Sequence, residues 1–364
     1  MDGANDRPVD RSSGQLHEAV PAPESAPQRL NDGAVCDFCR MPIPGEPIIA
    51  TVHGGQYQFC THACRERMDE IDHISAEYHG FRRIRPGVDG LDRDLPQGIP
   101  RNAFVLLSGE PGTREDTLGA ELVWRRLEQG EPAGIVTFTE PPISVVQRFL
   151  DMGWNILPAL EHDQVRIVDC FSSRMDDQDR FDRHLNDWNR HLRSFTEDHT
   201  EQVGDPGDPA EITNKIDNVV EDLEMIDRGI IHIDSLVEFG TLVQPVRAYD
   251  FIKDLRADVC KGRFVPIVAG ATRENEETSF PHDLSYVLDG IIDLALAPDI
   301  VADTLIRRIR VRKMTGVLAI TEWKAFEFTA GRGLVTFDPH AEMSKHGRTP
   351  PDAGSDPPTD GHSY

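Results

Sequence analysis

Five short apolar runs alternate with helical repeats along most of this chain, and this pattern restricts its fold more than any other feature. Each run has four or five residues and is rich in β-branched and aromatic types, as strands buried on both faces are. The runs begin at Phe104, Ile135, Val165, Ile230 and Phe264. Between the first two, apolar residues recur at helical spacing and Gly130 follows as a stop. Strands that alternate with helices predict an α/β fold with a mostly parallel sheet and right-handed crossovers.

Three features modify this pattern in the body of the chain, residues 80–340. Residues 171–215 form an acidic and aromatic segment, which we predict to be an insertion. Pro266 lies inside the fifth run, where it removes a hydrogen bond of the sheet. After Pro298 the period changes to alternation, and a C-terminal β-hairpin is predicted with strands at 326–328 and 334–337.

The regions outside the body differ from it in composition. Residues 1–33 and 341–364 are rich in polar residues and proline and lack an apolar period, so both are predicted to be disordered tails. A short segment that carries four cysteines, residues 34–75, lies between the first tail and the body. We therefore expect a small domain followed by a large one.

The chain is strongly acidic, with 63 Asp and Glu against 38 Lys and Arg and a formal net charge of −25. This surplus repels nucleic-acid phosphates and anionic lipid, so neither nucleic acid nor a membrane is a predicted partner. Excess acid combined with scarce lysine is typical of proteins that work in molar salt, which favours a halophilic cytoplasm. The sequence has no transmembrane-length apolar run and no secretory signal, so a cytoplasmic location is predicted.

Two cysteine pairs dominate the short segment: Cys36 with Cys39, and Cys60 with Cys64. Four thiolates from two tight knuckles can close a tetrahedron around Zn²⁺, and so small a segment has little apolar surface to fold by itself. An Fe–S site has the same ligand set and stays open. His53 and His62 are alternative ligands, although surface positions suit them better. The remaining cysteines, Cys170 and Cys260, are predicted to be buried small hydrophobic residues.

The residues around these cysteines resemble the TRASH and YHS group of small metal-binding domains. The resemblance rests on Gly54-Gly55-Gln56-Tyr57-Gln58-Phe59 before Cys60 and on a helix-like stretch after Cys64. It implies a role in sensing or handling heavy metals within a regulatory protein. Because all four ligand positions are cysteines, the set leaves no open coordination position, and a structural zinc is favoured over a catalytic one.

The first strand of the body leads into a loop placed like a phosphate-binding loop. Such a loop ends in Gly, Lys and Ser or Thr and is followed by a helix. Here the chain reads Gly109-Glu110-Pro111-Gly112-Thr113, and the three final positions hold Arg114, Glu115 and Asp116. A carboxylate therefore stands where a lysine would neutralise phosphate, and Arg114 replaces a glycine that allows unusual backbone angles.

With its flanking motifs the body, over roughly 85–340, resembles the KaiC-like branch of the RecA superfamily of ATPases. The motifs are Gly87-Val88-Asp89-Gly90 and Gly98-Ile99-Pro100-Arg101 before the loop, Thr137-Phe138-Thr139-Glu140 and Ile233-Asp234-Ser235 after two strands, and Lys313-Met314-Thr315-Gly316 near the end. The resemblance implies a RecA-like P-loop core that binds ATP between subunits. Its nucleotide-binding positions fall on Gly109, Gly112, Thr113, Thr117, Asp234 and Lys313, and Glu140 and Asp234 are vestiges of catalytic acids.

The departures from this family predict that hydrolysis is lost, because phosphoryl transfer depends on positioning and charge stabilisation. They also disfavour binding of ATP and Mg²⁺. The expected function is regulation or signalling by a catalytically degenerate domain joined to a domain that binds or senses metal. One alternative is a weakly active KaiC-like ATPase or kinase, in which Arg114 and Thr117 take over the roles of the loop lysine and the Mg²⁺ ligand. Another is a DNA-associated RecA or RadA relative.

Arg308, Arg310 and Arg312 fall on one face of a predicted strand. They form either a solvated or subunit-contact face or a phosphate-binding patch, and the acidity of the chain favours the contact. We therefore expect self-association or a protein partner through the large domain.

Overall fold

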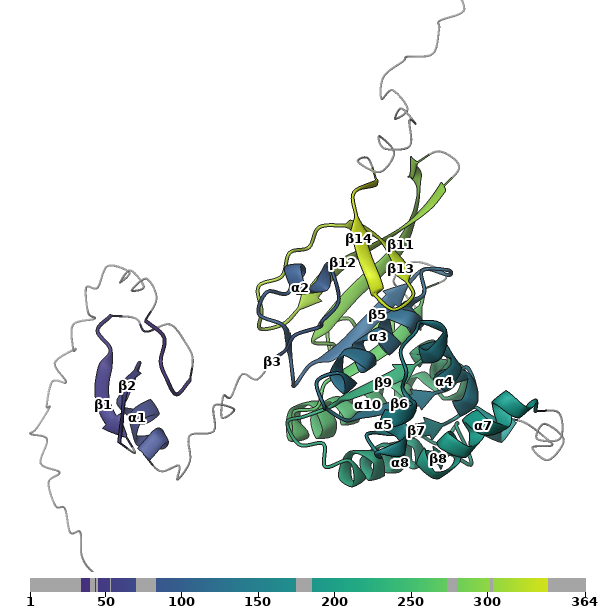
Figure 1. The fold of residues 1–364 in the computed structure, drawn as a ribbon, viewed down its shortest axis with the longest axis horizontal. Coiled ribbons are helices and arrows are strands. Elements are labelled where there is room, and N and C mark those ends of the chain that lie inside the picture. Colours follow the sequence, from purple (N-terminus) through teal and green to yellow (C-terminus); the bar gives the residue numbers. More distant parts are fainter. Residues whose placement is uncertain are drawn as a thin grey trace, which may run out of the picture. The chain divides into compact units, whose positions relative to one another are not determined.

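The computed structural model describes residues 34–39, 43, 45–52, 54–69, 83–174, 185–273, 280–301 and 304–339. The chain divides into two compact units, Met1–Gly80 and Phe81–Tyr364 (Figure 1). Both predicted disordered tails, residues 70–75 of the predicted small domain and residues 175–184 of the predicted insertion lie outside the described residues.

The first unit is a β-hairpin followed by a helix. Strands β1 (Ile48–Val52) and β2 (Gly55–Phe59) pair antiparallel, and α1 spans His62–Asp69. Their small core contains Cys36, Ile43, Val52, Phe59 and Met68. A core of this size is small for a separately folded unit.

The second unit is built on a ten-stranded sheet with the order β14-β13-β12-β11-β5-β10-β9-β6-β7-β8. From β11 to β8 all neighbours are parallel, and from β11 to β14 they are antiparallel. The strands span Phe104–Gly109 (β5), Ala133–Thr137 (β6), Val165–Asp169 (β7), Thr200–Gln202 (β8), Ile230–Asp234 (β9), Ile267–Thr272 (β10), Gly290–Val301 (β11), Thr304–Met314 (β12), Lys324–Thr329 (β13) and Gly333–Phe337 (β14). Two shorter strands, β3 (Arg83–Ile84) and β4 (Ile99–Pro100), pair separately beside α2 (Leu91–Asp94). The predicted α/β class, mostly parallel sheet and C-terminal hairpin are confirmed.

The fifth predicted strand differs from the expectation at its start. Strand β10 begins at Ile267, one residue after the proline, because Pro266 has no N–H to give to a sheet. Phe264 has a φ of 57° and lies outside the strand. The parallel register pairs Ile267 with Phe104 of β5 and with Ile231 of β9, so the shortened strand still lies at the centre of the sheet.

Helices cover both faces of this sheet, because side chains alternate along each central strand. On β5, Val105 and Leu107 belong to one apolar cluster, whereas Phe104 and Leu106 belong to the other. The first cluster is completed by α3 (Glu115–Leu127), α4 (Pro142–Asp151), α5 (Leu157–Glu161) and α7 (Asp187–Thr196). The second is completed by α8 (Pro209–Asp222), α9 (Leu236–Leu242) and α10 (Pro245–Leu255), which continues into a π-helical turn, Arg256–Gly262.

Residues 171–215 contribute to this core more than the predicted insertion would. Strand β8 lies at the edge of the sheet beside β7, and α8 begins at Pro209, where the Asp208 side chain accepts a 3.2 Å hydrogen bond from the Ala210 amide. The sequence did not reveal the start of α8, because an aspartate that caps a helix cannot be told from a surface aspartate by sequence alone.

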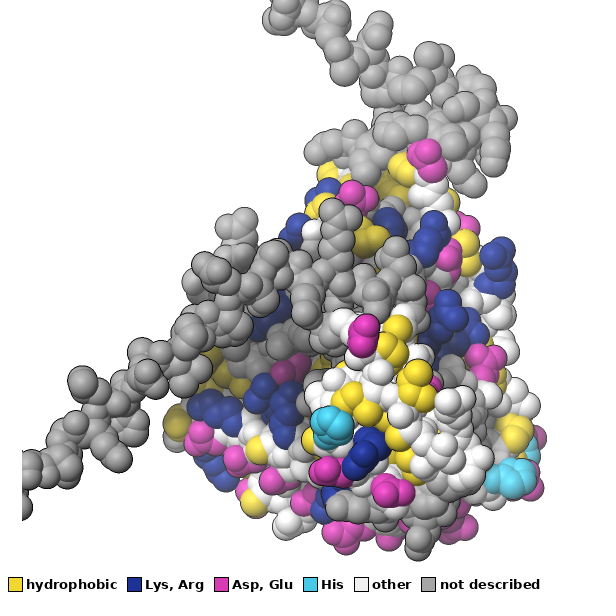
Figure 2. Space-filling view, turned by 90° about the vertical axis from the view of Figure 1, so that its left-hand side faces the viewer, with side chains coloured by type: hydrophobic (Ala, Val, Ile, Leu, Met, Phe, Trp, Pro, Cys, Tyr) yellow, Lys and Arg dark blue, Asp and Glu magenta, His cyan; other side chains and the backbone are white. Residues whose placement is uncertain are grey.

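None of the helices within the described ranges is both long and apolar enough to cross a lipid bilayer. Acidic side chains are interspersed with arginine and lysine side chains over the surface that Figure 2 shows.

Candidate functional site

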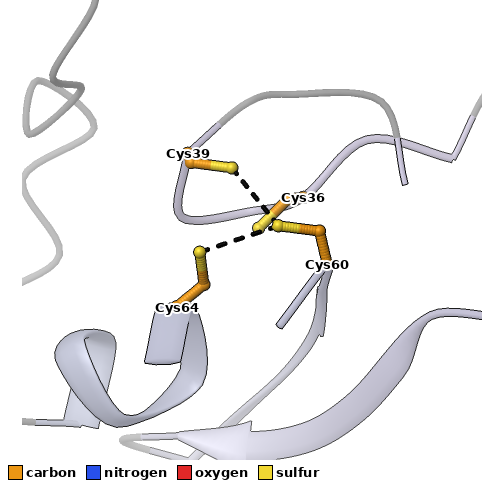
Figure 3. A group of neighbouring side chains, drawn as sticks. All are labelled: Cys36, Cys39, Cys60 and Cys64. Carbon is orange, nitrogen blue, oxygen red and sulfur yellow. Dashed lines mark hydrogen bonds between the residues drawn. The ribbon is translucent and has the colours of Figure 1, made fainter. Parts of the chain in front are cut away.

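The two cysteine pairs of the first unit meet at one point. Their four Sγ atoms all lie within 4.8 Å of one another, and the side chains point toward a common centre (Figure 3). Cys60 follows β2 directly, and Cys64 lies in the first turn of α1. The other pair lies on a loop that is held to β2, since the Gln58 amide donates to the Asp37 carboxylate at 2.7 Å and the Asp37 amide donates to the Gln58 carbonyl at 2.8 Å.

This donor set fits a single metal ion. A tetrahedron with Zn–S bonds of about 2.3 Å has edges of about 3.8 Å. The sulfur of Cys60 lies 3.5 Å from that of Cys39 and 3.7 Å from that of Cys64. The close approach of all four sulfurs favours one ion over a cluster of several irons, in which the cysteines bind different iron atoms. The structure brings together every predicted ligand, and zinc would be held by all four cysteines.

The pKa values of two thiols in this group are shifted in opposite directions. Burial and the neighbouring thiols raise the pKa of Cys60 to about 12. Burial also raises the pKa of Cys36, but hydrogen bonds from the backbone amides of Cys39 and Cys60 outweigh it and place this pKa below its ordinary value. The His62 side chain is exposed and lies outside the group, and His53 lies outside the described residues. Cys170 and Cys260 are buried, as predicted.

The loop of the second unit connects β5 to α3, and the carboxylate of Glu115, the first residue of α3, lies over it. The Glu115 side chain folds back over Gly109, so closely that a Cβ on that glycine would lie 2.6 Å from Glu115 Oε2. The Thr113 hydroxyl lies 3.4 Å from Oε2, and the Thr272 hydroxyl of β10 donates to Oε1. The loop therefore already contains an anion.

Burial raises the pKa of Glu115, and the negative charges of Asp116 and Asp234 raise it further. The hydrogen bond from Thr272 acts in the opposite direction and is too weak to cancel the burial. A carboxyl group with a raised pKa has a poorly stabilised charge. Among the described residues, the charges that shift this pKa are the acidic ones of Asp116 and Asp234.

Two further residues at the loop, Arg114 and Thr117, have unusual surroundings. Arg114 adopts the left-handed backbone conformation, with φ 65° and ψ 49°, and its guanidinium lies 5.5 Å from the ring centre of Phe328. A side chain can therefore occupy this strained position, at the energetic cost that glycine avoids. Thr117 is fully buried, and no partner for its hydroxyl is found in the described part of the chain.

Arg148, a residue that sequence reasoning missed, lies at the centre of an ionic cluster beside this loop. Its guanidinium lies 2.9 Å from Asp234 and 3.6 Å from Asp116, and it also contacts Glu140. The Thr139 hydroxyl donates to Asp234 at 3.3 Å. The predicted vestigial acids thus meet, but around an arginine. We define Arg148, Asp116, Glu140 and Asp234 as the Arg148 cluster.

Lys313 differs from the other predicted nucleotide-binding residues. Its ammonium group donates to the backbone carbonyls of Ser285 and Leu288, at 2.9 and 2.7 Å. Gly109 ends β5, Gly112 and Thr113 lie in the loop, Thr117 lies in the first turn of α3, and Asp234 ends β9. Because its hydrogen bonds go to the 285–288 segment, Lys313 within this chain supports that turn instead of the loop.

The predicted arginine face of β12 is partly neutralised within the chain. Asp293 of β11 lies 3.0 Å from both Arg310 and Arg312. The Trp323 ring packs against Arg308 and Arg310, whose guanidinium carbons lie 4.5 and 4.4 Å from its centre. Through Asp293 and Trp323, these contacts link the side chains of all three arginines on one face of β12.

Comparison with known proteins agrees with this architecture. A family model described as the ATPase KaiC matches residues 84–341. A UPF0273 protein of Methanopyrus kandleri is 27% identical over 247 residues, 68% of this chain and 89% of that protein. A UPF0273 protein of Pyrococcus horikoshii is 26% identical over 256 residues, 70% of this chain and 94% of that protein. The crystal structure of a KaiC-like protein from Pyrococcus horikoshii matches with a TM-score of 0.52 and 20% identity, over 71% of this chain and 100% of that one. The predicted RecA-like core is thereby confirmed, and the chain belongs to the KaiC family of ATPases.

Proposed function

We propose that this chain is an intracellular regulatory protein whose KaiC-family domain has kept the fold and lost ATP hydrolysis. In this function the domain serves as a platform for self-association or for a protein partner, and the cysteine unit binds zinc and senses metal or recruits that partner. The observation that carries the proposal is the Glu115 carboxylate, which lies inside the loop over Gly109.

The physical reason is the competition between two anions for one space. A phosphate loop binds its ligand through backbone N–H groups and a lysine. Here a bound phosphate has to displace Glu115 and then meets the negative charges of Asp116, Glu140 and Asp234, with Arg148 as their shared partner. Repulsion of this kind weakens both nucleotide binding and the stabilisation of a phosphoryl transition state.

A weakly active ATPase or kinase is the second candidate, and two observations favour it. The family to which the chain belongs is described by ATPase activity. Arginines also lie at the loop: Arg114 is part of it, Arg307 of β12 donates to the Gly112 carbonyl at 2.9 Å, and Arg273 lies 3.3 Å from the Glu110 carboxylate. These cations offer an alternative partner for phosphate if the Glu115 side chain turns away.

The test is a titration of a fluorescent ATP analogue into the full chain, in molar KCl with Mg²⁺. We compare the parent with Glu115→Lys and with a matched control, Glu128→Lys, which makes the same charge change at the other end of α3. We expect no saturable binding by the parent or the control, and binding at least about tenfold tighter by Glu115→Lys, a gain of about 1.4 kcal/mol.

Tight binding or rapid ATP turnover by the parent would overturn the proposal in favour of the ATPase. Equal behaviour of all three proteins without binding would show that Glu115 is not the barrier, and it would also contradict the proposed reason for the loss.

A further inference from the structure

Three carboxylates from three separate elements converge on one guanidinium in the Arg148 cluster. Asp116 lies at the start of α3, Glu140 follows β6 and Asp234 ends β9, whereas Arg148 lies on α4. The arginine side chain is only 16% exposed and that of Asp234 only 9%. Such a group differs from a surface ion pair because the acids approach one another only where a cation lies among them.

The charges in this cluster do not cancel. One guanidinium faces three carboxylates, and Glu115 contributes its electrostatic repulsion from the neighbouring loop. Burial, together with the charges of Asp234 and Asp116, raises the pKa of Glu140 in spite of its contact with Arg148. The excess of carboxylate oxygens around a single centre is the donor chemistry that a hard divalent cation prefers.

We propose that Arg148 is a resident cation that substitutes for a divalent metal, and that it makes this edge of the sheet independent of Mg²⁺. The guanidinium is planar and always charged, and its several N–H groups can contact three acids at once. In the native chain Arg148 therefore prevents metal binding and holds Asp116, Glu140 and Asp234 together. This inference concerns metal alone and does not require that nucleotide binding has been lost.

The experiment is thermal unfolding of the full chain, followed by tryptophan fluorescence, after chelator treatment and without nucleotide. All four tryptophans lie in the second unit, so the signal reports on that unit. We compare the parent with Arg148→Gln in the absence and presence of Mn²⁺. The parent should show no Mn²⁺-dependent shift. The variant should melt about 5 to 10 °C lower in chelator, because its acids repel one another, and should regain most of the loss with Mn²⁺.

Two further variants make the outcome specific. Adding Asp234→Asn to Arg148→Gln should abolish the recovery with Mn²⁺, because it removes a ligand. Arg101→Gln is the matched control: Arg101 also joins two acids, Glu131 at 2.5 Å and Asp227 at 3.8 Å, and its loss should not create a response to Mn²⁺.

A stabilising response to Mn²⁺ by the parent that disappears in Asp234→Asn overturns the proposal, since the cluster would then bind metal with Arg148 present. This comparison of the parent with Asp234→Asn needs no Arg148 variant, so it can overturn the proposal even if Arg148→Gln does not fold. A folded Arg148→Gln that ignores Mn²⁺, or a response equal to that of Arg101→Gln, also overturns it.

Discussion

A carboxyl group buried against the C-terminal hairpin should make the second unit less stable as the pH rises. Glu121 of α3 has no exposed side-chain surface. Its carboxylate accepts a 2.7 Å hydrogen bond from the Leu334 amide of β14 and a 3.1 Å hydrogen bond from Arg125, and it lies directly against Gly333. Burial, reinforced by the charge of Glu128, outweighs these two hydrogen bonds and raises the pKa of Glu121 to about 7.

The sign and size of the effect follow from this pKa. The rise from 4.5 to about 7 is worth about 3 kcal/mol, at about 1.4 kcal/mol for each pKa unit. Below pH 4.5 the group is protonated in both states and costs nothing. Between pH 4.5 and 7 the unfolded chain loses the proton first, so the free energy of unfolding falls, and above pH 7 the full cost is present.

The perturbation is Glu121→Gln, which keeps an oxygen for the Leu334 amide and removes the charge. Urea unfolding at fixed KCl, followed by tryptophan fluorescence, gives the free energy of unfolding of parent and variant from pH 5 to pH 8. The difference between the two should move by about 2 to 3 kcal/mol in favour of the variant as the pH rises. Glu161→Gln, at the exposed end of α5, serves as the control, because it leaves Glu121 and the charges around it in place and should follow the parent.

Parallel pH profiles for the parent and Glu121→Gln would refute this reasoning, because they would mean that Glu121 is no harder to ionise in the folded chain than in the unfolded one. A profile in which the variant loses its advantage at high pH would reverse the sign and refute it as well.

Two further predictions concern packing and metal. A Cβ at Gly119 of α3 would lie 2.1 Å from the buried His232 ring, so Gly119→Ala should lower the free energy of unfolding by about 2 kcal/mol, and adding His232→Ala should restore part of it in urea titrations. If His232→Ala restored none of the stability that Gly119→Ala removes, the predicted contact between these two residues would be wrong. Zinc removal by a chelator, or Cys60→Ser, should expose the amides of β1 and β2 to hydrogen exchange while the tryptophan-monitored unfolding of the second unit stays unchanged. Protection that survives in metal-free protein would show that the first unit folds without a metal ion.

The parts of the fold that depend on neighbouring residues were predictable from the sequence. The run from Phe104 and the helical repeat after it predicted β5 and α3 because periodicity reports which side chains are buried. The predicted fifth strand began too early, at Phe264, whereas β10 begins at Ile267. The missing N–H of Pro266 is a signal in the sequence that indicates this later start. Sheet order was not predictable, since it depends on hydrogen bonds between strands far apart in the chain.

The candidate sites divide in the same way. The sequence by itself determined which ligands and charges exist: two cysteine knuckles, and a loop with Glu115 in place of lysine. Spacing within the chain reveals these because the residues of each motif are close neighbours. Only the tertiary structure decided that Glu115 folds back over Gly109 and that Arg148, one of many arginines, lies among three acids. Arg148 is separated from Asp234 by 86 residues, and burial together with electrostatic attraction in the folded core selects this pair among all possible pairs.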